Sequence, residues 1–150
     1  MDFSDRLPLQ IKRHTQLTLE LSELEKRGIR VVTRADKSIY PQKLRLKFKD
    51  TGIAIPSIIY YVGELSLVNS FSAVAVVGSR DLTSDSGAQK FTELFVEKAV
   101  QSGFAISSGG AKGIDHIAES TSRCCGGISI ITVPDSLSKR ILDPRLEIQY

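Results

Sequence analysis

Residues 73–80 read AVAVVGSR and residues 104–115 read FAISSGGAKGID, and each stretch joins a short apolar run to a glycine-rich turn. Each turn carries a cation, which is Arg80 in the first and Lys112 in the second. Continuous runs of small and β-branched apolar residues are typical of strands buried on both faces of a parallel sheet. The two stretches therefore predict two parallel strands that end in similar loops.

Two segments with helical periodicity accompany these strands. The first covers about residues 85–102, with Ser84 as a suitable N-cap, and the second covers residues 113–125. A third apolar run follows at residues 128–133. The side chains expected to be buried are Ala88, Phe91, Phe95 and Ala99 in the first helix and Ile114, Ile117, Ala118 and Thr121 in the second. This alternation predicts a Rossmann-like α/β fold, a parallel sheet with right-handed crossovers and helices on both faces.

Upstream of this pattern the sequence is organised differently. We expect residues 1–70 to form a basic lead-in region that packs on the core, and residues 71–150 to form the N-terminal part of the Rossmann-like domain. The elements expected in the lead-in are a helix carrying Leu17, Leu21 and Leu24, strands at residues 29–33 and 58–62, and a short helix after Tyr40-Pro41. The chain ends at Tyr150, where further strands and helices are expected to complete a doubly wound sheet.

Composition and charge limit the function classes. The chain has 150 residues, of which 41% are hydrophobic and 25% charged, and its formal net charge is +3. These values are typical of a globular protein and give only weak support for a polyanionic partner. The cations concentrate in one stretch, which contains Lys26, Arg27, Arg30, Arg34, Lys37, Lys43, Arg45, Lys47 and Lys49. This stretch is consistent both with a solvated face and with a phosphate-contacting surface.

The cysteines and the apolar segments indicate the compartment. Cys124 and Cys125 are adjacent, so they supply no disulfide framework, and we expect them to be packed as small hydrophobic side chains. No apolar stretch approaches the roughly 18 residues that a membrane span needs. We therefore expect a cytoplasmic protein without a membrane partner.

The two glycine-rich turns predict an anion site. In parallel α/β sheets, ligands bind at the carboxyl ends of the strands, where helix N-termini point N–H groups outward. Glycines allow the backbone to approach a ligand closely, while Arg80 offers a planar fork and Lys112 a mobile point charge. Neither turn matches the dinucleotide fingerprint or the Walker A loop. We therefore expect phosphate groups at this edge, and no cofactor.

The motifs resemble those of the DNA-processing protein A (DprA/Smf) family, which carries V-G-[ST]-R after one strand and S-G-x-A-x-G-I-D after the next. The matching residues are Val77 to Arg80 and Ser108 to Asp115. The resemblance covers roughly residues 28–133 and includes the Tyr-Pro-x-x-Leu segment that begins at Tyr40. The chain is therefore identified as a divergent member of that family.

This resemblance implies non-catalytic binding of single-stranded DNA in DNA processing and recombination. It also implies a RecA-type recombinase as a partner, and we expect a homodimer. Arg80 and Lys112 would contact phosphates. The pocket would be shaped by Gly78, Ser79, Ser108, Gly109, Gly110 and Gly113. Asp115, at the start of a helix, is expected to orient backbone amides, because a carboxylate that faced DNA phosphates would be repelled.

Some residues depart from the family pattern. Glu119 stands where the family usually has a histidine, and Ser86-Gly87 stands in place of its Tyr-Gly pair. His14 and His116 lie far apart in the sequence, and no His, Cys and Asp cluster has the spacing of metal ligands. The sequence thus favours a binding protein over an enzyme and predicts no catalytic residue and no metal site. The alternative is a nucleotide or nucleotide-derived signal in the same pocket, bound by a sensor or by an N-glycosidic hydrolase.

Overall fold

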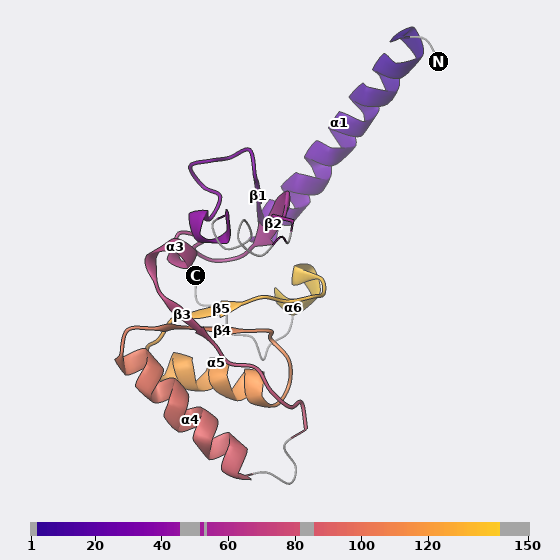
Figure 1. Ribbon diagram of the computed structural model, residues 1–150. Helices are drawn as coiled ribbons and strands as arrows, with labels where there is room; N and C mark the ends of the chain where they lie inside the picture. The colour runs from indigo at the N-terminus through magenta and orange to yellow at the C-terminus, as the bar shows by residue number, and fades with distance from the viewer. Residues whose placement is uncertain (1–2, 46–51, 53, 82–85, 142–150) are drawn as a thin grey trace. The chain divides into compact units, whose positions relative to one another are not determined.

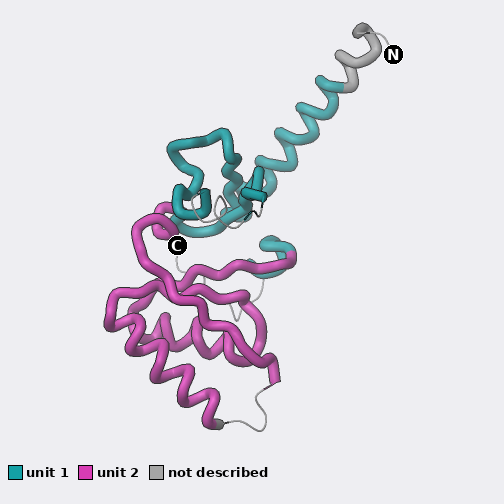
Figure 2. The backbone as a smooth tube through the Cα atoms, viewed as in Figure 1, with its two compact units in different colours: residues 1–65, 136–150 teal, residues 66–135 magenta. Residues whose placement is uncertain are grey.

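The computed structural model describes residues 3–45, 52, 54–81 and 86–141 of the chain (Figure 1). Its contacts divide the chain into two compact units, one of residues 66–135 and one of residues 1–65 together with 136–150 (Figure 2). The domains expected from the sequence, residues 1–70 and 71–150, stay a prediction.

The unit that contains the N-terminal region is built on a long helix and a two-stranded sheet. Helix α1 (Phe3–Lys26) ends before Gly28, whose φ of 74° favours glycine. Strands β1 (Arg30–Thr33) and β2 (Ile58–Tyr61) pair in antiparallel fashion, and residues 42–45 form the short helix predicted after Tyr40-Pro41. Helix α6 (Leu137–Ile141) also belongs to this unit.

Tyr40 lies at the centre of the small core of this unit. Its side chain is fully buried, together with Ile29 and Val32, and its hydroxyl donates a hydrogen bond to the Pro56 carbonyl oxygen (2.8 Å). The bond ties the turn around Tyr40 to the segment that leads into β2. In contrast, Leu17 on α1 is 55% exposed, so most of this helix makes no core.

The second unit has the predicted α/β order. Helix α3 (Leu67–Ser70) precedes β3 (Ala73–Ala75), α4 (Ser86–Gln101), β4 (Ala105–Ser108), α5 (Ile114–Cys124) and β5 (Ser129–Ile131). The strands form a parallel sheet in the order β3-β4-β5, so the predicted α/β class with a parallel sheet is confirmed, whereas helices on both faces of this sheet stay a prediction. Helices α4 and α5 contact each other and β4, and they lie on the same face of this sheet (Figure 1).

The core of the second unit lies between that face and the two helices. Its buried members are Val76, Val96, Ile106, Ile114 and Ala118. Strand β4 lies between β3 and β5. Its Ile106 pairs with Val74 of β3 on one side and with Ser129 of β5 on the other. Because β4 is almost wholly buried, its carboxyl end brings residues 108–113 to the edge of the sheet in a fixed position.

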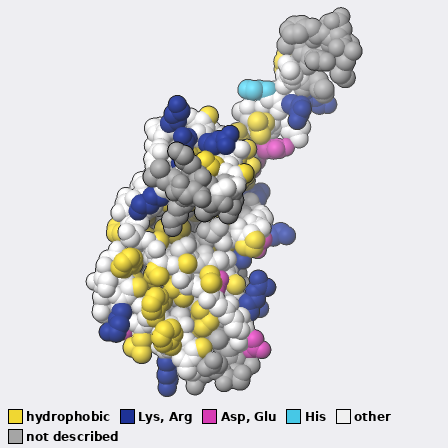
Figure 3. Space-filling view, viewed as in Figure 1, with side chains coloured by type: hydrophobic (Ala, Val, Ile, Leu, Met, Phe, Trp, Pro, Cys, Tyr) yellow, Lys and Arg dark blue, Asp and Glu magenta, His cyan; other side chains and the backbone are white. Residues whose placement is uncertain are grey.

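Burial was predicted wrongly for β3 and α4. Strand β3 is not buried on both faces, because Val74 and Val76 pack with the core while the alternate residues face away from it, and Val77 is 69% exposed. On α4 the phenylalanines face outward, with Phe91 70% exposed and stacked on Phe95 at 6.2 Å between ring centroids. Figure 3 shows apolar side chains gathered over α4. Thr92 and Val96 pack inward instead, because small side chains allow α4 to approach β4 and α5 closely.

Helix α5 also differs from its prediction. Ile114 and Ala118 are buried as expected, but Ile117 and Thr121 are only half-buried. The remaining buried residues of the helix are polar, namely Asp115, Glu119 and Ser122. Cys124 and Cys125 are both exposed, so the prediction that they are packed was wrong. None of the described helices is long and apolar enough to cross a membrane.

Replacing Tyr40 by Phe should lower the free energy of unfolding by about 0.5–1.5 kcal/mol, the usual contribution of one hydrogen bond. The change removes only the hydroxyl that bonds to the Pro56 carbonyl oxygen. Tyr60→Phe is the matched control, because Tyr60 is 55% exposed, and it should leave stability within error. Chemical denaturation of both variants measures the difference, and equal stabilities would contradict the role assigned to Tyr40.

Candidate functional site

The two glycine-rich turns are interlocked through their backbones. A Cβ atom built on Gly113, whose φ is 78°, would lie 2.1 Å from the Ser79 carbonyl oxygen and 2.9 Å from Arg80 Cα. A Cβ atom on Gly78 would lie 2.7 Å from Ile114 Cγ1. The N–H of Ile114 donates to the Ser79 carbonyl oxygen (3.1 Å), which locks the first turn to the start of α5. Glycine is therefore required at both contact points.

Asp115 joins the same two turns by accepting hydrogen bonds from three backbone N–H groups. Its Oδ1 accepts from Gly78 (3.3 Å), and its Oδ2 accepts from Gly109 (3.2 Å) and Ala111 (3.4 Å). The side chain is 5% exposed. The prediction that Asp115 orients backbone amides is confirmed. These three N–H groups are consequently already engaged, and ligand contact depends on other groups of the loops.

Arg80 and Lys112 are both exposed. Within the residues that the structure describes, neither is in an ion pair with a carboxylate. Ser79 fixes the backbone beside Arg80, because its hydroxyl donates to the Asp81 carbonyl oxygen (2.8 Å) and accepts from the Asp81 N–H (3.2 Å). Since Gly113 packs against the Arg80 backbone, the segment that carries Lys112 lies beside the one that carries Arg80. The predicted cations are thus brought to one edge of the sheet.

Ser108 differs from the other predicted site residues because its side chain is turned inward. It is 4% exposed, and it lies near Glu119, which is 3% exposed. Burial raises the pKa of the Glu119 carboxyl above its ordinary value, and the nearby polar groups of Ser108 and of the Gly110 backbone act in the opposite direction. This buried carboxyl was not predicted from the sequence. The available signal was its spacing, because Glu119 follows Asp115 by one helical turn.

Some cations of the basic lead-in stretch bond to carbonyl oxygens of the protein, and others have exposed side chains. Arg45 bonds to the Arg34 carbonyl oxygen and lies over the Tyr40 ring, and Arg30 bonds to the Gly63 carbonyl oxygen. These two arginines therefore support the fold. Arg34 and Lys37 have exposed side chains. The structure does not describe Lys47, Lys49 or the predicted N-cap, Ser84.

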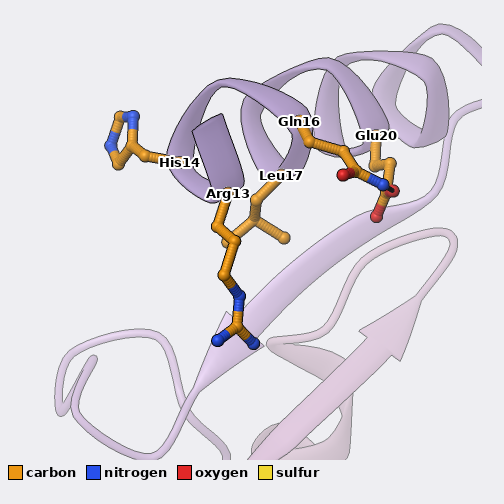
Figure 4. Close-up of a pocket in the computed structure, with 5 residues that line it drawn as sticks. All are labelled: Arg13, His14, Gln16, Leu17 and Glu20. Carbon is orange, nitrogen blue, oxygen red and sulfur yellow. Dashed lines mark hydrogen bonds between the residues drawn. The ribbon is translucent and has the colours of Figure 1, made fainter. Parts of the chain in front are cut away.

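A second possible site is a surface depression on α1 (Figure 4). Its lining residues are Arg13, His14, Gln16, Leu17 and Glu20, which come from a single helix. Gln16 donates to Glu20 (2.9 Å), and all five side chains are exposed. An open depression on one exposed helix lacks the converging groups of a binding site. In the described part of the chain, no three His, Cys, Asp or Glu residues could hold a metal ion together.

Comparison with known proteins agrees with the motifs of the interlocked turns. The model of the family described as DNA recombination-mediator protein A matches residues 30–144. The chain belongs to this family. The family match thus includes both glycine-rich turns, the two cations and Asp115.

Two relatives give the extent of the similarity. Protein Smf from Escherichia coli (strain K12) is 34% identical over 104 residues, which are 69% of this chain and 26% of Smf. The X-ray structure of DNA processing protein A (DprA) from Streptococcus pneumoniae is similar with a TM-score of 0.57 and 30% identity, covering 75% of this chain and 37% of DprA. The chain therefore spans only part of the length of these members of the family.

Replacing Gly113 by Ala should destabilise the protein by more than about 3 kcal/mol, because a backbone overlap adds to the cost of a positive φ. The added Cβ would overlap the Ser79 carbonyl oxygen. Gly103→Ala is the matched control, since Gly103 has a φ of 81° and open space around it. That control should cost only about 1–2 kcal/mol, the penalty of the left-handed conformation. Equal losses in chemical denaturation would contradict the interlocking of the turns.

Replacing Glu119 by Gln should stabilise the protein increasingly as the pH rises. The folded-state pKa of Glu119 is raised, so the folded protein binds this proton more tightly than the unfolded chain does. The protein therefore loses stability as the pH rises from the ordinary glutamate pKa through the raised one. Glutamine has no carboxyl proton to release, so the variant does not show this loss. Thermal unfolding at several pH values checks this expectation. A difference between the two proteins that stays constant with pH would contradict it.

Proposed function

We propose that the interlocked turns bind the phosphate backbone of single-stranded DNA without catalysing a reaction. The observation that carries this proposal is the pair of exposed cations, Arg80 and Lys112, on two loops that Asp115 holds together. The family description, DNA recombination-mediator protein A, supports a role in DNA processing and recombination. The proposed role of the site is therefore to hold a strand.

The chemistry of the two cations suits successive phosphates. The Arg80 guanidinium can donate two parallel hydrogen bonds to one phosphate, and the Lys112 ammonium can contact another as a point charge. The carboxylate of Asp115 is buried and engaged by backbone N–H groups, so it does not face the ligand. A single strand is favoured over a duplex because its flexible backbone can bring neighbouring phosphates to both cations.

The proposal also covers the expected partners. The family description, DNA recombination-mediator protein A, is consistent with a RecA-type recombinase as a partner. We propose that recombinase and a second copy of this chain as protein partners. Arg34 and Lys37 of the basic lead-in region have exposed side chains, and we propose them as phosphate contacts of that region itself.

A salt titration distinguishes this function from binding of a small nucleotide. An oligothymidylate should lose affinity steeply with salt, with a slope of about −0.7 for each phosphate contacted, whereas a mononucleotide should show a shallow slope. A duplex of the same length serves as the third ligand. A mononucleotide that binds more tightly than the oligothymidylate would favour the nucleotide-sensor alternative, and tighter binding of the duplex would contradict the preference for single strands.

Arg80→Ala and Lys112→Ala should each weaken oligothymidylate binding by about 1.5–3 kcal/mol, the range for hydrogen bonds to charged groups. Because both side chains are exposed, thermal unfolding should change little. If the cations share one strand, the double variant should depart from additivity. Lys90→Ala on α4 is the matched control, because Lys90 is an exposed cation on another element. Full affinity in both single variants would rule out this site.

A further inference from the structure

Three consecutive backbone N–H groups of the second loop lie near two carboxyl groups of α5. Asp115 accepts hydrogen bonds from Gly109 and Ala111, and the N–H between them, that of Gly110, lies near the Glu119 carboxyl group. Gly110 has a φ of 69°, so its peptide group is turned in a way that other residues rarely adopt. The loop is thus supported from beneath by two acidic side chains one helical turn apart.

The two carboxyl groups have different surroundings. Asp115 uses both of its oxygens, whereas Glu119 Oε1 has no hydrogen-bond partner. The Ser108 hydroxyl lies near the Glu119 carboxyl, yet its Oγ also makes no hydrogen bond of normal geometry. Both side chains are at least nine-tenths buried, with 4% of Ser108 and 3% of Glu119 exposed. An ionised carboxylate in such a place is unfavourable, and a proton removes its charge.

We propose that Glu119 is a positioning residue for the loop of residues 109–113, and that binding of a phosphate anion at this loop is coupled to protonation of its carboxyl group. The proposal rests on the proposed function, because it takes the loop as the place where DNA phosphates bind. Glu119 does not itself touch the ligand, since its side chain is buried beneath the loop. It acts through the Gly110 peptide group.

The direction of the coupling follows from the charges around Glu119. The Asp115 carboxylate disfavours a second negative charge, while His116 favours one when it is protonated. A phosphate bound at the loop adds negative charge on the other side of the peptide groups, so it further favours the neutral form. Binding therefore takes up a proton, and by linkage the affinity falls as the pH rises through the pKa of Glu119.

The test measures oligothymidylate binding between about pH 5 and about pH 8 at constant ionic strength, with isothermal titration calorimetry in two buffers of different ionisation enthalpy to count protons. One linked proton changes affinity by at most about tenfold per pH unit, and we expect a total loss of about three- to tenfold. The Glu119→Gln variant should lack this loss and the proton uptake. Thermal unfolding of each sample confirms that the variant is folded.

His116→Gln is the matched control, because His116 is an exposed residue of the same helix whose charge also acts on Glu119. The His116→Gln variant should retain the fall in oligothymidylate affinity with rising pH that Glu119→Gln removes. If Glu119→Gln keeps the full pH dependence and proton uptake, the coupling is wrong while the binding site stands. If the unaltered protein binds no oligothymidylate at any pH, the proposed function fails and the coupling fails with it.

Discussion

The hydrogen bonds that Asp115 accepts from two separate turns are the constraint on which the rest of the site depends. One side chain at the start of α5 receives N–H groups from Gly78 after β3 and from Gly109 and Ala111 after β4. Neighbouring parallel strands end at the same edge of a sheet, but nothing in that arrangement alone fixes the distance between their loops. Asp115 and the close contact at Gly113 fix it, and they bring the segments that carry Arg80 and Lys112 side by side.

This arrangement differs from the usual anion site of an α/β fold. Backbone N–H groups and the helix N-terminus normally supply much of the attraction for a phosphate. Here a carboxylate has taken three of those N–H groups, so the amides serve to hold the loops. In the proposed site, the attraction for an anion would then come mainly from the exposed side chains of Arg80 and Lys112. Such a site suits a polymer that varies in conformation better than one rigidly placed small ligand.

The sequence predicted the order of the elements and the two glycine-rich turns after the strands, because both depend on local signals. Glycines after apolar runs predicted the turns, and the position of Asp115 at a helix start predicted its capping role. Burial was predicted less well. Phe91 and Phe95 of α4 were expected in the core and are exposed. Glu119 and Ser122 of α5, in contrast, are buried despite their polarity. Which helical face turns inward depends on close packing between α4, α5 and β4, and hydrophobicity alone does not determine it.

Nuclear magnetic resonance titration of the protein with an oligothymidylate tests the central claim most directly, with the side chains of Arg80 and Lys112 and the loop amides as probes. The largest shifts should occur at the Arg80 Nε and the Lys112 Nζ resonances and at the amides of residues 79–80 and 112–113. The N–H groups of Gly109 and Ala111 should stay protected from exchange, since Asp115 retains them. Binding that leaves both cation resonances unchanged, with shifts confined to α1 or to the basic lead-in stretch, would contradict the account.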